Sequence, residues 1–150
     1  MWISSDSPEV RLTGRWASLN GTATATAAGS YFEASYTGEL ATLRFDMANM
    51  ADPLPHLWIQ VDDGPRIESV LAAYLRVRAK GNGPHRVTVI LKGAVEQQSR
   101  WEHPLVGKIS FLGLEAEGTA PLAPDIRPTI ELPLLKNEKP VGEVRTFFQL

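Results

Sequence analysis

Four tryptophans are the residues of this 150-residue chain whose type best suits a binding site. Trp58 lies in "HLWIQV" between Leu57 and Ile59, so strand alternation would turn its indole away from the core. An exposed indole face suits stacking against the C–H groups of a sugar ring. These aromatic residues therefore predict carbohydrate binding or packing against another domain, although packing is the commoner role for one tryptophan. The further aromatic candidates are Trp16, Trp101 and Tyr31.

Nucleophilic hydrolysis would need Ser, Thr or Cys beside a base, usually His, with a third group that orients the base. The chain has three histidines, and none of its serines lies in a G-x-S-x-G or G-D-S motif. His85 follows a Gly-Pro turn and enters a strand, so we expect it to pack or to form local hydrogen bonds. The sequence therefore identifies no catalytic residue.

Acidic side chains are the remaining candidates for chemistry. Asp62 and Asp63, in the turn "DDG", are weak candidates for calcium ligands, because aspartates in turns more often accept hydrogen bonds from nearby backbone. No H-E-x-x-H or EF-hand pattern is present, and there is no cysteine. Two glutamates could hydrolyse glycosides if the fold held them about 5–9 Å apart, but sequence spacing predicts no such pair. We expect no metal and no cofactor, and rank a carboxylate-pair enzyme last.

Alternating apolar and polar residues predict the strands that would position these side chains. The inward faces expected from this alternation are Ala41, Leu43, Phe45 and Met47 in residues 40–47, Leu57, Ile59 and Val61 in 56–61, Val87, Val89 and Leu91 in 86–92, and Ile109 and Phe111 in 108–116. Residues 22–38 are rich in Thr, Tyr and Phe and also favour strands. Gly113 predicts a bulge or a close backbone contact.

Residues 66–80 are ambiguous, because their apolar residues fit one face of a helix and, later, a half-buried strand. We expect a loop or short helical turn first, a strand from about Tyr74, and a hairpin loop over residues 80–85, "KGNGPH". The pattern as a whole predicts seven to nine short strands. That number is typical of a single all-β domain, a β-sandwich of jelly-roll or immunoglobulin-like type.

Composition excludes several classes of protein. The chain is 43% hydrophobic and 21% charged, which is ordinary for one globular domain. Its net charge of −2, without a basic cluster, argues against nucleic-acid binding. No apolar run reaches the roughly 20 residues that span a membrane. The N-terminus lacks the pattern of a signal peptide, which predicts a cytoplasmic protein, or a secreted one if a leader has been removed.

The order of local motifs resembles the N-terminal jelly-roll domain of carbohydrate esterase family 2 and related bacterial SGNH (GDSL) hydrolases. The matching segments run from about Arg11 to Glu131. In order, they are "GRW", "AGSYFEASYTG", "LRFDM", "WIQVDDG", "GPHRVTVILKGAVE", "GKISFLGLEA" and "RPTIEL". Each motif is weak alone, whereas the ordered set is fairly specific. The resemblance implies a galactose-binding-like jelly roll over residues 1–131, followed by a divergent tail over 132–150.

In such proteins the jelly roll precedes an α/β hydrolase domain that removes acyl groups from carbohydrates, and a G-D-S serine at the join is the nucleophile. Here "RPTIE" resembles the start of that join, but "LPLLKNEKPVG" follows in place of G-D-S. The resemblance therefore implies a non-catalytic accessory domain whose partner is an SGNH hydrolase domain or a carbohydrate. Two alternatives stay open, a free-standing lectin-like module and a homo-oligomer formed through an exposed sandwich face.

Overall fold

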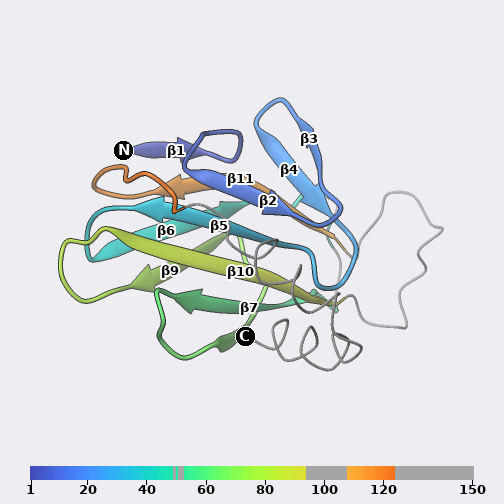
Figure 1. Cartoon of the computed structure of the whole chain (residues 1–150). Helices are drawn as coiled ribbons and strands as arrows, with labels where there is room; N and C mark the ends of the chain where they lie inside the picture. The colour runs from blue at the N-terminus through green and yellow to red at the C-terminus, as the bar shows by residue number, and fades with distance from the viewer. Residues whose placement is uncertain (49, 51–52, 94–107, 124–150) are drawn as a thin grey trace, which may run out of the picture.

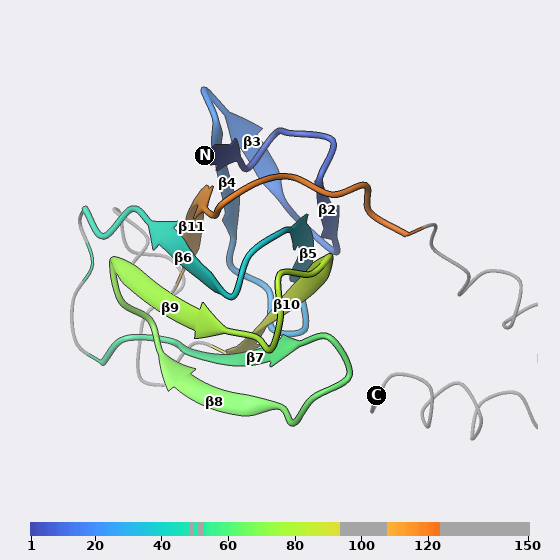
Figure 2. The same ribbon diagram turned by 90° about the vertical axis from the view of Figure 1, so that its left-hand side faces the viewer.

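Eleven β-strands and no helix make up the part of the chain that the structure describes, residues 1–48, 50, 53–93 and 108–123 of a computed structural model (Figure 1). The strands pair into two antiparallel sheets that face each other as a sandwich, seen as two layers in Figure 2. The predicted all-β sandwich is confirmed. Within the described residues no helix is long and apolar enough to cross a membrane.

The two sheets differ in the number of their strands. The six-stranded sheet has the order β3 (Ala17–Leu19), β4 (Thr22–Ala25), β11 (Ile109–Glu115), β6 (Leu40–Phe45), β9 (Tyr74–Arg78), with β1 (Trp2–Ser4) also paired to β11. The five-stranded sheet has the order β2 (Val10–Thr13), β5 (Tyr31–Tyr36), β10 (His85–Gly93), β7 (His56–Val61), β8 (Ile67–Val70).

The core lies between the sheets, where three phenylalanines meet. Phe32 of β5 stacks on Phe111 of β11 with ring centroids 3.9 Å apart, and Phe45 of β6 lies 5.5 Å from Phe111. All three side chains are buried. Burial of one such ring contributes about 1.5–3 kcal/mol. This cluster joins one sheet to the other at the centre of the sandwich.

The inward faces predicted from alternation are confirmed in every one of the four segments. Of the twelve apolar residues expected inside, ten are buried, and Met47 and Val61 are partly buried against the same core. The alternation of apolar and polar residues along a strand therefore predicts which side chains point inward, wherever one face of the strand contacts the opposite sheet.

The expectation of a loop or helical turn before Tyr74 was wrong for residues 67–70, which form β8. This strand lies at the edge of its sheet and pairs with β7. Ile67 is 61% exposed and Val70 47% exposed, and Leu71 alone of the apolar set before Tyr74 is fully buried. The apolar residues that fitted one face of a helix therefore do not share a surface that packs on the core. The strand predicted from Tyr74 is confirmed as β9.

The hairpin predicted over "KGNGPH" was also wrong, because β9 and β10 belong to different sheets. The loop instead carries the chain from one layer of the sandwich to the other. The Gly38 N–H donates to the carbonyl of Asn82 at 2.7 Å, which fixes the loop against the turn after β5. Glycine and proline predicted a reversal of the chain, but they do not determine which strands pair.

Sequence patterns did not predict β1, β2 and β3, which are three or four residues long. Each has too few residues to show an alternation. β1 pairs with β11, more than a hundred residues away, so its strand form depends on a distant partner. The predicted irregularity at Gly113 is confirmed, because the pairing of β11 with β6 shifts register between Phe111 and Gly113.

Residues 116–123 follow β11 and cross from the six-stranded sheet toward the five-stranded sheet (Figure 2). Gly118 bridges to Thr37 just after β5. The Ser35 hydroxyl then donates to the carbonyl of Ala120, and the Arg11 guanidinium donates to the carbonyl of Ala123. We call residues 116–123 the strap. It ends its described course on the outer side of the five-stranded sheet.

We predict that Gly113→Ala lowers the free energy of unfolding by about 3 kcal/mol or more. Gly113 has φ +147°, and an added Cβ would overlap the carbonyl oxygen of Ile3 and lie 2.7 Å from the Trp2 ring. Gly29→Ala is the control, because Gly29 has φ +88° but nothing within 4 Å of the added atom. That variant should lose only about 1 kcal/mol in the same urea titration. Equal losses in the two variants would contradict the proposed overlap.

Candidate functional site

The outer face of the five-stranded sheet carries two of the predicted aromatic residues in one cross-strand row. The register pairs Tyr31 with Ile90 and Ile90 with Trp58. Side chains directly opposite in neighbouring strands share a face, so Tyr31 and Trp58 lie on either side of Ile90. The same row continues to Glu68 on β8. Trp58 therefore faces outward, as its position between Leu57 and Ile59 predicted.

Charged groups already occupy the surroundings of Trp58. The Lys92 ammonium lies over the indole, 5.0 Å from the ring centroid. It also donates to Glu68 at 2.8 Å, and the other Glu68 oxygen lies 2.7 Å from Nδ1 of His56. The hydrogen bond from Lys92, followed by that from His56, lowers the pKa of Glu68. A sugar ring could stack on this side of Trp58 only if Lys92 moved away.

Trp16, another of the predicted tryptophans, does not join this row. Trp16 is partly buried against the core, with its ring edge toward Phe32 at a centroid distance of 6.1 Å. Its indole N–H donates to the carbonyl of Thr13 at 2.9 Å. Trp16 thus packs at the rim of the sandwich. Trp101 lies outside the described residues.

His85 holds two loops together and has no free ring nitrogen. Its Nδ1 lies 2.7 Å from the Asp62 carboxylate, and its Nε2 lies 2.8 Å from the carbonyl of Gly81. Both partners only accept hydrogen bonds, so the protonated ring, which can donate from both nitrogens, satisfies both contacts. The Gly81 carbonyl raises the pKa of His85 against the opposing effect of burial, and Asp62 raises it further. The predicted local role of His85 is confirmed.

Asp62 is likewise occupied, which bears on the weak calcium hypothesis. One of its carboxylate oxygens accepts from His85, and the other accepts from the backbone N–H of Arg86 at 2.9 Å. Across the described ranges, no three His, Cys, Asp or Glu side chains gather to hold a metal ion. The aspartate therefore has a structural role, but it accepts hydrogen bonds from β10 and not from the backbone of its own turn as expected.

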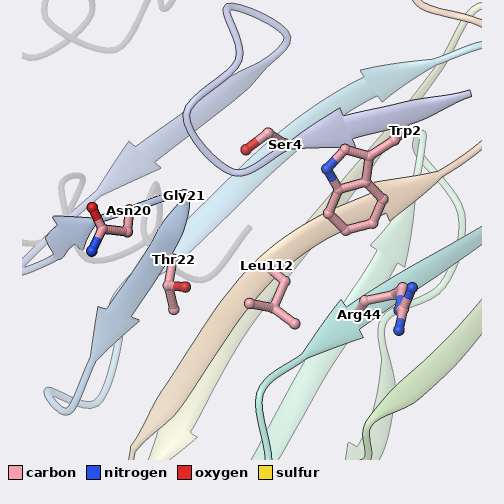
Figure 3. Close-up of a pocket in the computed structure, with 7 residues that line it drawn as sticks. All are labelled: Trp2, Ser4, Asn20, Gly21, Thr22, Arg44 and Leu112. Atoms are coloured by element: carbon pink, nitrogen blue, oxygen red, sulfur yellow. The ribbon is translucent and has the colours of Figure 1, made fainter.

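A pocket of about 330 Å³ lies on the outer face of the other, six-stranded sheet, where sequence reasoning placed no site (Figure 3). It is lined from β1, β4, β6, β11 and the turn between β3 and β4. Figure 3 shows the Leu112 side chain between Thr22 and the Trp2 indole. The lining residues are Trp2, Ser4, Asn20, Gly21, Thr22, Arg44 and Leu112.

Arg44 is the one charged residue in this lining, and its guanidinium is held from several sides. Nη1 lies 3.1 Å from Glu115, and Nη2 donates to the Tyr74 hydroxyl at 3.0 Å. The guanidinium carbon lies 4.8 Å from the Tyr74 ring centroid and 5.9 Å from that of Trp2. The arrangement joins two exposed aromatic rings through one neutralised cation.

One signal in the sequence bears on this pocket. Alternation in residues 40–47 turned Arg44 toward solvent, and this orientation is confirmed. The pairing of β1 with β11 brings Trp2 beside Arg44, however, and no local pattern predicts that pairing. The site was therefore missed because it depends on contacts between distant segments.

Comparisons with known proteins connect this fold to esterases. No protein-family profile and no curated protein matches the chain. Among solved structures, it is similar to a family two carbohydrate esterase from Cellvibrio japonicus, with a TM-score of 0.62 and 19% identity over 83% of this chain and 36% of the esterase. It is also similar to an acetyl xylan esterase, Est2A, from the rumen bacterium Butyrivibrio proteoclasticus. The TM-score is 0.56 and the sequence identity is 17%, over 81% of this chain and 34% of Est2A.

A third similar structure is a family two carbohydrate esterase from Clostridium thermocellum in complex with cellohexaose. Its TM-score is 0.51 and its identity 20%, over 77% of this chain and 33% of that protein. Such identities establish similarity of fold. The chain spans about a third of the length of these esterases. The predicted structural resemblance to family 2 esterases is confirmed.

We predict that the free energy of unfolding falls as the pH rises above about 6.5. The pKa of His85 in the folded protein is raised above its ordinary value of 6.5. Its stabilising contribution is therefore complete below that value and is lost as the pH passes through the folded-state pKa. Urea titrations at a series of pH values would measure the slope.

His85→Gln is the control for this pH dependence, because glutamine can still donate to the Gly81 carbonyl but does not titrate. The variant should be less stable than the parent at low pH and should show a flatter slope. A parent that gains stability over this range, or a variant with an unchanged slope, would show that His85 is not the group responsible.

Proposed function

We propose that this chain is the non-catalytic β-sandwich accessory domain of an SGNH-type carbohydrate esterase, one that removes acetyl groups from glycans. The observation that supports this most is the coverage of the structural similarity. About four fifths of this chain aligns with about one third of each esterase. An accessory domain next to a larger catalytic domain would give this ratio.

The sequence supports a non-catalytic role. Acyl transfer needs a nucleophile, a base and oxyanion donors within hydrogen-bond reach of one point. No serine of the chain lies in a G-D-S motif. His85, the buried histidine beside an aspartate, has both ring nitrogens hydrogen-bonded, to Asp62 and to the Gly81 carbonyl, so neither is paired with a serine hydroxyl.

The outer face of the five-stranded sheet suits contact with a hydrolase domain. The strap brings the chain to this side, where Arg11 of β2 holds the carbonyl of Ala123. Tyr31 and Trp58 offer aromatic area on the same face, with Ile90 between them. Aromatic residues at the centre of a surface, surrounded by charged groups, are typical of interfaces. Because Lys92 covers Trp58, packing fits this residue better than sugar stacking.

A free-standing lectin-like module is the second candidate function. Exposed aromatic rings favour it, in particular Trp2 at 47% and Tyr74 at 60% exposure, since such rings suit contact with sugar rings. This candidate differs from the first in the genetic context it implies. It requires no hydrolase domain encoded next to the chain.

We predict that the purified chain does not hydrolyse p-nitrophenyl acetate above the rate of buffer. The expected result follows from the missing nucleophile motif. His85→Gln serves as a matched control, because it removes the buried imidazole and should leave the background rate unchanged. Turnover that scales with protein concentration and survives repurification would overturn the non-catalytic assignment.

The esterase context can be tested in the DNA that follows the codon of Leu150. We expect one of the three reading frames to encode a G-D-S motif followed by a hydrolase domain. Such a frame would separate the accessory domain from the lectin-like module, for which we expect unrelated sequence at that place. An unrelated gene immediately downstream would count against the esterase assignment.

A further inference from the structure

The lining of the pocket on the six-stranded sheet has the chemistry of a site for a polyhydroxylated ligand. It combines one large aromatic ring with an amide, two hydroxyls and a guanidinium, contributed by Trp2, Asn20, Ser4, Thr22 and Arg44. In the described part of the chain, the side chains of Ser4, Asn20 and Thr22 form no hydrogen bond. Their polar atoms are therefore available to a ligand. An apolar body with a few placed polar groups is typical of small-molecule sites.

Trp2 is held in place before any ligand arrives. A Cβ at position 113 would lie 2.7 Å from its ring, so the indole rests where Gly113 leaves room. The Arg44 guanidinium carbon lies 5.9 Å from the ring centroid. The neighbouring Ile3 is 1% exposed and anchors β1 in the core. A fixed, 47% exposed indole loses little conformational entropy when a ligand stacks on it.

The charge on Arg44 does not direct the pocket toward anions. Glu115 pairs with this guanidinium at 3.1 Å, and no other residue of the lining is charged. A carboxylate or phosphate ligand would have to displace Glu115 to gain an ion pair. A neutral ligand can use the remaining N–H groups of the guanidinium as directed donors without disturbing that pair.

We propose that this pocket binds a neutral glycan, with one sugar ring stacked on Trp2 and its hydroxyls bonded to Asn20, Ser4, Thr22 and Arg44. The volume of about 330 Å³ is at the lower end of ligand pockets and suits one or two sugar units. Tyr74, 60% exposed on the far side of Arg44, extends the aromatic surface along a longer chain. The strap leads to the opposite sheet, so a hydrolase domain packed there would leave this pocket open.

The proposal deepens the proposed function, because it names a ligand class for the accessory domain. Its test is independent of esterase activity. Affinity electrophoresis in gels that contain mannan, xylan or a β-glucan should retard the purified chain in at least one gel. Isothermal titration with the matching oligosaccharide should then give a dissociation constant that changes little with added salt, because no ion pair forms.

Trp2→Ala should weaken binding by about tenfold or more, through loss of the stacking surface. Trp2→Phe keeps an aromatic ring and should recover most of the affinity, which separates lost stacking from lost folding. Arg44→Lys keeps the charge but not the planar donor fork and should weaken binding by roughly threefold or more. Ile67→Ala removes an exposed apolar side chain from the other sheet and should bind as the parent does.

In the parent protein, NMR titration with the oligosaccharide should shift the indole N–H signal of Trp2 and leave that of Trp16 in place. Several outcomes would overturn the proposal without touching the esterase assignment. They are no retardation in any neutral gel, retardation by polygalacturonate alone, and binding lost in Trp58→Ala but kept in Trp2→Ala. A dimer that Trp2→Ala dissociates would overturn it as well, since the face would then be an interface between copies.

Discussion

The contact between Phe32 and Phe111 joins the two sheets in the core, and the orientation of both outer faces depends on it. The two rings lie on interior strands of opposite sheets, with centroids 3.9 Å apart, and Phe45 packs beside them. Because residues alternate along a strand, holding Phe111 inward also determines which residues of β11 point outward. Leu112 consequently lines the pocket on the outside.

The two outer faces differ in chemistry although the same core supports them. On the five-stranded sheet, Lys92, Glu68 and His56 form a charged network around Trp58. On the six-stranded sheet, Arg44 and Glu115 neutralise each other beside an open indole. A surface crossed by the strap and a surface with a pocket therefore lie on opposite sides of one sandwich. This separation would let one domain contact a protein and a glycan at once.

Local pattern predicted what depends on neighbouring residues. Strand faces such as Leu43 and Val89, the turn at Asp62, the irregularity at Gly113 and the outward position of Trp58 were all confirmed. The failures involve tertiary partners. β8 is a strand because β7 offers its edge, and the loop before His85 joins two sheets rather than two paired strands. The pocket was missed because Trp2 meets Arg44 only once β1 has paired with β11.

The strap has a consequence for any domain attached beyond it. Hydrogen bonds from Ser35 and Arg11 hold its backbone down to Ala123, so a connection to such a domain begins no earlier than Ala123 and is shorter than one counted from the end of β11. A shorter free connection confines the attached domain to a smaller volume. The effective concentration of the two domains rises accordingly, and a weak contact between them can be occupied most of the time. A small interface between the sandwich and the attached domain is then enough to keep the two domains in contact.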